Sequence, residues 1–481
     1  MPRLTLSISN FLGGVAPSAY SGDYRSQADP TTFGWDSANI IDMGLLRRGF
    51  GLTTVTGASI ITGSVRWVKT YGSFTPYAYA YEENTNPTAN RLHRINVSTH
   101  TVTPSGTFPA TLNTYSESNG MELYDGYLYY ATGQYLGRYD LNTTFDNSFY
   151  LSLGTTCLGA TIRHPMVQGY GKLFIGNSYT NASLTNACSV AKIEAGVVTA
   201  DALPLGKTQK VVKCLEFHNA NLYIGLSSNL YGDRTIRCDT SMLVWDTVSP
   251  GWQKEIPFPE EDIVALKSWN GSLYAWGARG VYVFNGTGFS QIFLTPAGPN
   301  LSSEVDVSPY GLLYWKGTDS AANQGIYAYG ALDERQTKVP FKPYFEYGGA
   351  SQPIVWVNKD NLYVFGYSSG EKIRRFNSAT DASYGTATWK SSMINMPGNA
   401  QIVDIKVMMA SLPSGTSVTL GWAKDDGIAE DLITANTLGQ TLIKTVPNGK
   451  ISDEFQVYIK HTSGPTPKIH RIDIEYENIQ E

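Results

Sequence analysis

Asn270-Gly-Ser-Leu-Tyr-Ala-Trp-Gly277 is the stretch of the sequence that decides the fold. Asn-Gly between apolar runs is a strong hairpin signal, because both residues tolerate positive φ angles. A Leu-Tyr pair on a short apolar run follows this turn, and a glycine ends the run. The stretch therefore predicts a tight turn that opens a β-strand.

The chain repeats this phrase at a nearly constant distance. Its leucine recurs at spacings of 45, 49, 51, 40 and 49 residues, an average of about 47. A period of roughly 40–50 residues with strand–turn–strand content is typical of β-propeller blades. Ala78-Tyr79, 50 residues before Leu128-Tyr129, is interpreted as a degenerate seventh copy. We therefore predict a propeller of about seven blades, with equivalent buried positions for the anchor leucines Leu128, Leu173, Leu222, Leu273, Leu313 and Leu362.

The repeat divides the chain into three parts, and the expected fold class is all-β. Residues 1–60 lack a sustained period of 2 or 3.6 and are interpreted as an extended N-terminal arm. Residues 61–391 hold the blades. Residues 392–481 lose the repeat, and their alternating strands predict a C-terminal β-sandwich, with His470, Ile472, Ile474 and Tyr476 on one face of the last strand. Residues 425–433 are the one candidate helical turn in this part.

Composition excludes several classes of function. Charged residues make up 16% of the chain and the net charge is −5, without a basic stripe, so sequence-independent binding to nucleic-acid phosphates is not expected. No run approaches the roughly 18 apolar residues that span a bilayer, so we predict no membrane insertion. The first residues lack the basic and apolar regions of a signal peptide.

Residue types that commonly bind metals or cofactors lack the necessary spacing. The six histidines form no His-x-His or His-Glu-x-x-His motif, and we expect no catalytic residue, no cofactor and no metal. The cysteines form no Cys-x-x-Cys pair and are interpreted as buried, reduced thiols. They are Cys157, Cys188, Cys214 and Cys238. Whether Glu260-Glu261-Asp262, or Asp425-Asp426 with Glu430, holds calcium stays open, because neither has EF-hand spacing.

Three features of the first 60 residues occur in a characteristic order. They are Ser7-Ile-x-Asn-x-Leu-Gly-Gly-Val15, then Trp35, then Gly44-Leu-Leu-Arg-Arg-Gly49. Over about 45 residues this order resembles the N-terminus of the tail tubular (nozzle) proteins of short-tailed bacteriophages, although Gly49 stands where those proteins usually have proline. The resemblance implies a non-enzymatic structural protein of the virion tail, whose partners are other tail proteins and further copies of this chain.

We expect the arm and the C-terminal sandwich to make the contacts between subunits, with the arm packing on another subunit or another virion protein. The arm holds large apolar groups but lacks the periodicity to bury them in an element of its own. Glycines permit close backbone approach, and arginine forks suit carboxylates or carbonyls of a partner. The expected contact residues are Phe11, Gly13, Gly14, Trp35, Leu45, Leu46, Arg47 and Arg48. The competing interpretation is that the arm folds back and completes the first blade of its own propeller, since propellers often close with strands from both chain ends.

Two other functions stay open at this stage. The first is a tail protein that binds a host receptor or surface glycan, and a wide polar face ringed by aromatic residues would favour it. The second is a secreted propeller enzyme that cleaves polysaccharides, which a concave pocket with convergent carboxylates would favour.

Overall fold

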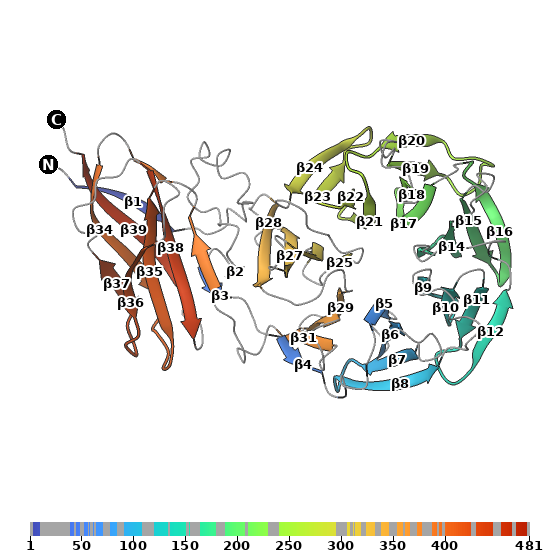
Figure 1. Ribbon diagram of the computed structural model, residues 1–481, viewed down its shortest axis with the longest axis horizontal. Coiled ribbons are helices and arrows are strands. Elements are labelled where there is room, and N and C mark those ends of the chain that lie inside the picture. Colours follow the sequence, from blue (N-terminus) through green and yellow to red (C-terminus); the bar gives the residue numbers. More distant parts are fainter. Residues whose placement is uncertain are drawn as a thin grey trace.

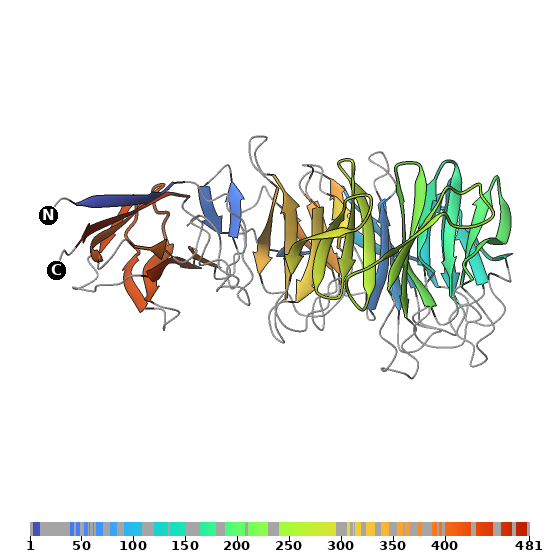
Figure 2. The same cartoon turned by 90° about the horizontal axis from the view of Figure 1, so that it is seen from above.

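The computed structural model describes residues 3–9, 39–42, 45–48, 52–55, 57, 61, 64–70, 77–83, 91–107, 120–132, 135–150, 153, 164–178, 188–206, 210–228, 240–294, 305–307, 311, 313–318, 324–331, 338–345, 354–358, 361–365, 373–377, 387–391, 394–396, 400–424, 430–445, 454–463 and 468–478. These residues form strands β1 to β39 and no helix, so none of them lies in a helix that could cross a membrane. Figure 1 shows a ring of blades with a second, sandwich-like part beside it, and Figure 2 shows the ring edge-on as a disc. The predicted all-β class, with a propeller and a sandwich, is confirmed.

The described residues form seven four-stranded antiparallel sheets around one axis, which are the blades. The first three are β5 (Ser64–Thr70), β6 (Tyr77–Glu83), β7 (Arg91–Asn96) and β8 (Thr101–Thr107); β9 (Gly120–Tyr124), β10 (Tyr127–Thr132), β11 (Tyr135–Tyr139) and β12 (Phe145–Tyr150); and β13 (Met166–Gly169), β14 (Lys172–Asn177), β15 (Ser189–Glu194) and β16 (Val197–Pro204). The next three are β17 (Lys210–His218), β18 (Asn221–Ser228), β19 (Ser241–Trp245) and β20 (Lys254–Pro257); β21 (Ile263–Trp269), β22 (Ser272–Gly277), β23 (Gly280–Phe284) and β24 (Phe289–Leu294); and β25 (Val305–Val307), β26 (Leu313–Thr318), β27 (Gln324–Gly330) and β28 (Val339–Phe345). The seventh combines β29 (Ile354–Asn358), β30 (Asn361–Phe365) and β31 (Ile373–Asn377) with β4 (Leu52–Thr54).

The anchor leucines occupy one repeated position, as predicted. Each lies on the second strand of its blade, and five of them are 0% exposed: Leu128, Leu173, Leu222, Leu273 and Leu313. Their partners on the third strand are all large and apolar: Tyr139, Ile193, Trp245, Phe284 and Tyr329. Leu362 has the same place on β30, but its side chain lies outside the described residues. The repeat therefore specifies the layer of side chains that packs blade against blade.

The turn and the terminal glycine of the opening stretch have separate physical reasons. Asn270 and Gly271 adopt φ angles of 47° and 73°, the left-handed conformation expected of a two-residue hairpin. A Cβ added at Gly277 would lie 2.4 Å from Cδ of Glu260, which precedes the blade in sequence. A larger residue at position 277 would require that carboxylate to shift.

The seventh blade is closed by a strand from the N-terminal part of the chain. β4 pairs with β31 in the register Leu52↔Phe376, Thr53↔Arg375 and Thr54↔Arg374. The assignment of all of residues 1–60 to an arm is therefore wrong for this strand, which belongs to the propeller. The competing interpretation is correct in kind, although β4 completes the last blade and not the first. It contributes hydrogen bonds to an edge that would otherwise be left open.

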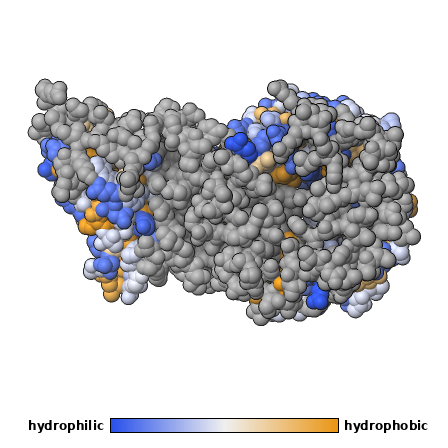
Figure 3. Space-filling model, viewed as in Figure 1, coloured by the Kyte–Doolittle hydropathy of each residue, from blue (hydrophilic) through white to orange (hydrophobic). Residues whose placement is uncertain are grey.

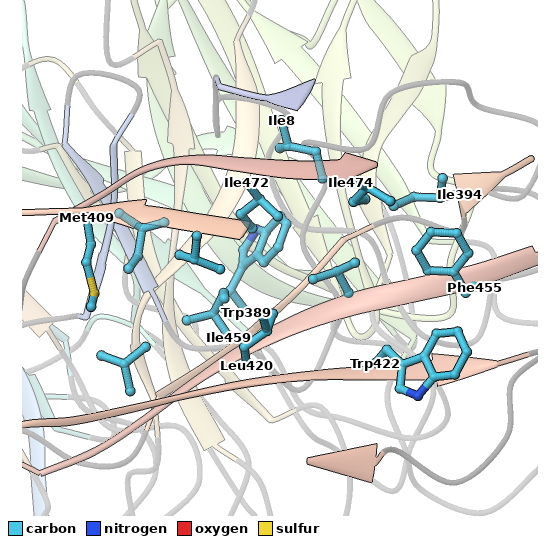
Figure 4. Packing of buried hydrophobic residues seen from close by; sticks show 14 of the residues in the cluster. Ile8, Trp389, Ile394, Met409, Leu420, Trp422, Phe455, Ile459, Ile472 and Ile474 are labelled. Atoms are coloured by element: carbon cyan, nitrogen blue, oxygen red, sulfur yellow. The ribbon is translucent and has the colours of Figure 1, made fainter. Parts of the chain in front are cut away.

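The sandwich packs two sheets face to face. One contains β2 (Asn39–Asp42), β3 (Leu45–Arg48), β39 (Ile469–Asn478), β34 (Ala400–Met409) and β37 (Leu442–Thr445), with β1 (Leu4–Ile8) also paired to β39. The other contains β32 (Ala387–Lys390), β38 (Glu454–Ser463), β35 (Ser417–Lys424) and β36 (Glu430–Ala435), with β33 (Ile394–Asn395) paired to β38. Figure 4 shows residues of both sheets meeting in the core, among them Trp389, Leu420, Phe455 and Ile472. Because β32 carries the fully buried Trp389, the sandwich begins before the predicted boundary at residue 392.

The remaining described strands of the expected arm belong to this sandwich. β1 pairs with β39 from Leu4↔Tyr476 to Ile8↔Ile472, and β3 pairs with the same strand at Leu46↔Ile469. Figures 1 and 2 place β2 and β3 between the sandwich and the propeller, where β2 contacts the outer strand β28. These strands are therefore not a separate extended arm, because their hydrogen-bonding partners lie in the same chain, and the expected contact of this segment with another subunit stays a prediction.

Two local predictions in the sandwich also need correction. His470 is exposed and does not share the buried face, because β39 bulges between its pairings Met409↔Ile469 and Met408↔Arg471. Ile472 and Ile474 are 0% exposed, as the alternation predicts. The C-terminal part of the candidate helical turn is strand β36, paired with β35, and residues 425–429 lie outside the described residues.

Candidate functional site: the central cavity of the propeller

A cavity of about 340 Å³ lies where the inner strands of the blades converge. Side chains from β5, β9, β13, β17, β21 and β25 line it, and those of the seventh inner strand, β29, lie outside the described side chains. These strands surround the propeller axis in Figure 1. The lining contains three ammonium groups and three carboxylates: Lys69, Lys213, Lys267, Glu122, Glu216 and Asp306.

Most of these charges occupy one repeated position, which we call the inner tier. In each blade, an aromatic residue follows the anchor position on the second strand. The inner-tier residue is the first-strand residue that pairs with this aromatic residue, as Glu122 pairs with Tyr129. Around the ring, the inner tier consists of Lys69, Glu122, Val167, Glu216, Lys267, Asp306 and Val355. Five of its seven members are charged. Since the strands share one register, the inner tier forms a belt of mixed charge at one level of the axis.

Contacts within the inner tier join neighbouring blades. Lys69 Nζ of the first blade lies 3.0 Å from Glu122 Oε2 of the second. The backbone N–H of Leu123 donates to the other oxygen of Glu122 at 3.0 Å. In the same way, the N–H of Val307 donates to Asp306 Oδ1 at 2.8 Å. These two carboxylates are thus held in fixed orientations by the strands that carry them.

Glu216 is an inner-tier carboxyl whose pKa is shifted by its surroundings. Burial raises the pKa of its carboxyl, and the Lys267 ammonium on the adjacent blade only partly offsets that effect. The N–H of Ser268, also on that blade, donates to Glu216 Oε1 at 3.1 Å.

Bulges direct further side chains into the cavity. β5, β17 and β21 each shift register at the equivalent place, between Val65 and Trp67, Val212 and Cys214, and Ile263 and Ala265. Such bulges re-aim side chains and are frequent near functional sites. The extra residue of β17 is Lys213, which lines the cavity and lies 3.5 Å from Asp262 Oδ2.

The site residues expected from the sequence are not part of this cavity. Leu45, Leu46, Arg47 and Arg48 form β3, which pairs with β2. The other four, Phe11, Gly13, Gly14 and Trp35, lie outside the described residues. Sequence reasoning missed the inner tier, although the sequence contains a signal for it. When the seven blade repeats are aligned with one another, a charged residue interrupts the apolar first strand at the same position in five of them.

The carboxylates considered as calcium ligands have separate protein partners. Glu260 accepts from the N–H of Arg279 at 2.8 Å and from the Tyr282 hydroxyl at 2.7 Å. Asp262 contacts Ser227 Oγ and Lys213. Within the described part of the chain, no group of three His, Cys, Asp or Glu side chains could hold a metal ion, and Asp425-Asp426 lies outside that part.

Two of the cysteines can be assigned. Cys188 and Cys214 are buried and form no disulfide, as predicted, while Cys157 and Cys238 lie outside the described residues. Burial raises the pKa of the Cys214 thiol, and the nearby Asp262 carboxylate adds to that effect. A thiol with a raised pKa is a weak nucleophile.

Comparisons with known proteins reveal no relatives in sequence: no protein-family model matches the chain, and no curated protein matches it. Among solved structures, the chain is similar to the computationally designed Ika8 protein, with 9% identity, a TM-score of 0.39, and coverage of 76% of this chain and 98% of the other. It is also similar to an exo-β-1,3-galactanase from Phanerochaete chrysosporium, with 10% identity, a TM-score of 0.29, and coverage of 67% and 98%. The Pan2 WD40 domain from Neurospora crassa has 10% identity, a TM-score of 0.44, and coverage of 72% and 99%. These likenesses carry no argument about function.

Proposed function

We propose that the protein is a non-enzymatic structural component of a bacteriophage tail, where it contacts copies of itself and other tail proteins. The observation that carries the proposal is the path of the N-terminal strands. β3 extends the sandwich within the segment whose sequence resembles nozzle proteins, β1 extends it at the start of that segment, and β4 closes the propeller just after it. Backbone hydrogen bonds of this N-terminal segment thus connect it to both the sandwich and the propeller, which suits a structural component of a larger assembly.

The part of the contact between copies that the sandwich contributes lies, in this proposal, on the outer face of the β1–β39–β34–β37 sheet. Charges of both signs follow one another across it, with Lys444 Nζ 3.0 Å from Asp404 Oδ2 and Arg3 Nε 3.2 Å from Glu477 Oε1. Lys406 pairs with Glu475 on the same face. A surface with equal numbers of acidic and basic groups can face a rotated copy of itself without net repulsion.

An apolar pair adjoins these charges. Met408 and Leu442 are cross-strand partners on β34 and β37, and they are 38% and 45% exposed. Figure 3 shows hydrophilic and hydrophobic residues side by side on the described surface of the sandwich. Apolar groups bordered by charges are common in protein–protein contacts.

The self-association part of the proposal can be tested on the purified chain. Mass photometry over a range of concentrations is expected to show oligomers that the double variant Met408→Asp with Leu442→Asp dissociates. Val197→Asp, which introduces a charge at a residue that is 67% exposed on a propeller hairpin, is the matched control and should leave the oligomers intact. A wild-type chain that stays monomeric would count against this contact.

The virion location needs a separate experiment. Purified particles of a phage that encodes the chain should contain it in stoichiometric amounts by mass spectrometry, and antibodies to it should label the tail in electron micrographs. Particles that lack the protein, or measurable glycan cleavage by the pure chain, would overturn the proposal.

A further inference from the structure

We propose that the central cavity of the propeller is a binding site for a small neutral saccharide. The proposal rests on the inner tier and the bulged residue Lys213, and it is independent of where the protein is located. The cavity volume of about 340 Å³ is within the range of small-molecule sites, which begins near 300 Å³.

The balance of charge indicates the class of ligand. Three lysines and three carboxylates line the cavity, so an anion or a cation would meet as many repulsive as attractive groups. The lysines also have acidic neighbours: Lys69 pairs with Glu122, and Lys213 pairs with Asp262. A charged ligand would have to compete with these partly buried ion pairs, which costs binding free energy.

A polyhydroxyl ligand avoids this cost. Each hydroxyl can donate to a carboxylate and accept from an ammonium group, so it bridges an ion pair without breaking it. Gln168 and Thr70 also line the cavity and add neutral donors and acceptors. Glu216 supplies a carboxyl whose described hydrogen bond is to the backbone of the adjacent blade, and it has surface facing the cavity.

Apolar surface completes the site. Trp67 lines the cavity at a position directly after the bulge of β5, and it is only partly buried against its neighbours. Aromatic rings provide a flat apolar surface with a polar edge, and the C–H face of a pyranose is complementary to such a surface. Met166 and Val264 border the same space. Partly exposed apolar groups beside paired charges therefore favour a sugar ring over a purely polar ion.

Saturation-transfer NMR and calorimetry on the full chain, with D-glucose, D-galactose, N-acetyl-D-glucosamine and their β-linked disaccharides as probes, test the proposal. At least one probe is expected to bind with a millimolar dissociation constant that changes less than twofold between low and high salt, because the ligand is neutral. Trp67→Leu and Lys213→Met should each weaken binding about tenfold or more, as expected for loss of a stacking plane or of a charged hydrogen bond.

Lys192→Met is the matched control, because Lys192 also forms an ion pair, with Glu194, but lies on a third strand away from the cavity. It should bind like the wild type, and thermal melting of all variants should establish that they are folded. If Trp67→Leu does not fold, Lys213→Met decides the outcome. Absence of binding by every probe overturns the proposal, as does saccharide binding that Lys213→Met leaves unchanged. Strong binding of acetate or ammonium, lost at high salt, would also overturn it.

Discussion

Replacing Leu273 by alanine measures how much one anchor position contributes to the propeller. Leu273 is 0% exposed and belongs to a cluster that joins the fourth and fifth blades, with Cys214, Tyr223 and Tyr282 among its members. The substitution removes three buried carbon atoms, which cost about 2.4 kcal/mol at ~0.8 kcal/mol each. A residual cavity of about 50 Å³ adds about 1.2 kcal/mol at ~24 cal/mol per Å³. We therefore expect a loss of about 3–4 kcal/mol.

Urea unfolding followed by tryptophan fluorescence measures this loss as a lower midpoint at constant slope. Leu438→Ala is the control, since Leu438 is 71% exposed, and it should change stability by less than about 0.5 kcal/mol. A loss below about 1 kcal/mol for Leu273→Ala would refute the reasoning. It would mean either that the blades repack freely around the cavity or that the repeat position does not hold them together.

Three further predictions concern the termini, the inner tier and the thiols. Deleting residues 1–9 removes β1 and should destabilise the sandwich alone. Deleting residues 1–55 also removes β4 and should make the propeller sensitive to limited proteolysis. Identical digestion patterns for the two deletion variants would contradict this prediction. Because burial raises the folded-state pKa of Glu216 above its ordinary 4.5, ionisation destabilises the native state as the pH rises through that raised pKa. The melting temperature of Glu216→Gln should therefore be higher than that of the wild type at pH 8 and equal to it at pH 4. A lower melting temperature of the variant at pH 8 would show that the folded protein stabilises the ionised carboxylate. Mass spectrometry after iodoacetamide treatment should find Cys188 and Cys214 unmodified until urea is added, and rapid native labelling of either would show that its blade opens.

The repeat made most of the propeller predictable, because its signals are local. A Leu-Tyr pair after an Asn-Gly turn contains both the hairpin geometry and the residue that packs between blades, and both lie within a few positions of each other. Leu128 and Leu273 are equivalent in the fold for that reason. The alternation of β39 predicted its buried face equally well, except at His470, where a bulge moves the side chain to the surface.

The inner tier escaped prediction because its chemistry depends on register between strands. Glu122 and Lys69 are 53 positions apart, and neither belongs to a motif. They become partners only because each lies opposite the same repeat position of its own blade, on adjacent first strands. A search for spacing within the chain cannot find such a set, whereas an alignment of the copies column by column can.

The N-terminal strands present the same difficulty in a stronger form. β1 spans five residues and β4 three, too few for a periodic signal, and their pairing partners lie more than 300 positions away. What identifies their partners is the free edges of β39 and β31, which exist only after the rest of the chain has folded. Pairing with these edges accounts for the backbone of β1 and β4 within one chain. If the N-terminal strands stay paired within their own chain in an oligomer, the subunits do not exchange these strands. Oligomer formation should then depend on surface residues such as Met408, and Met408→Asp should weaken it.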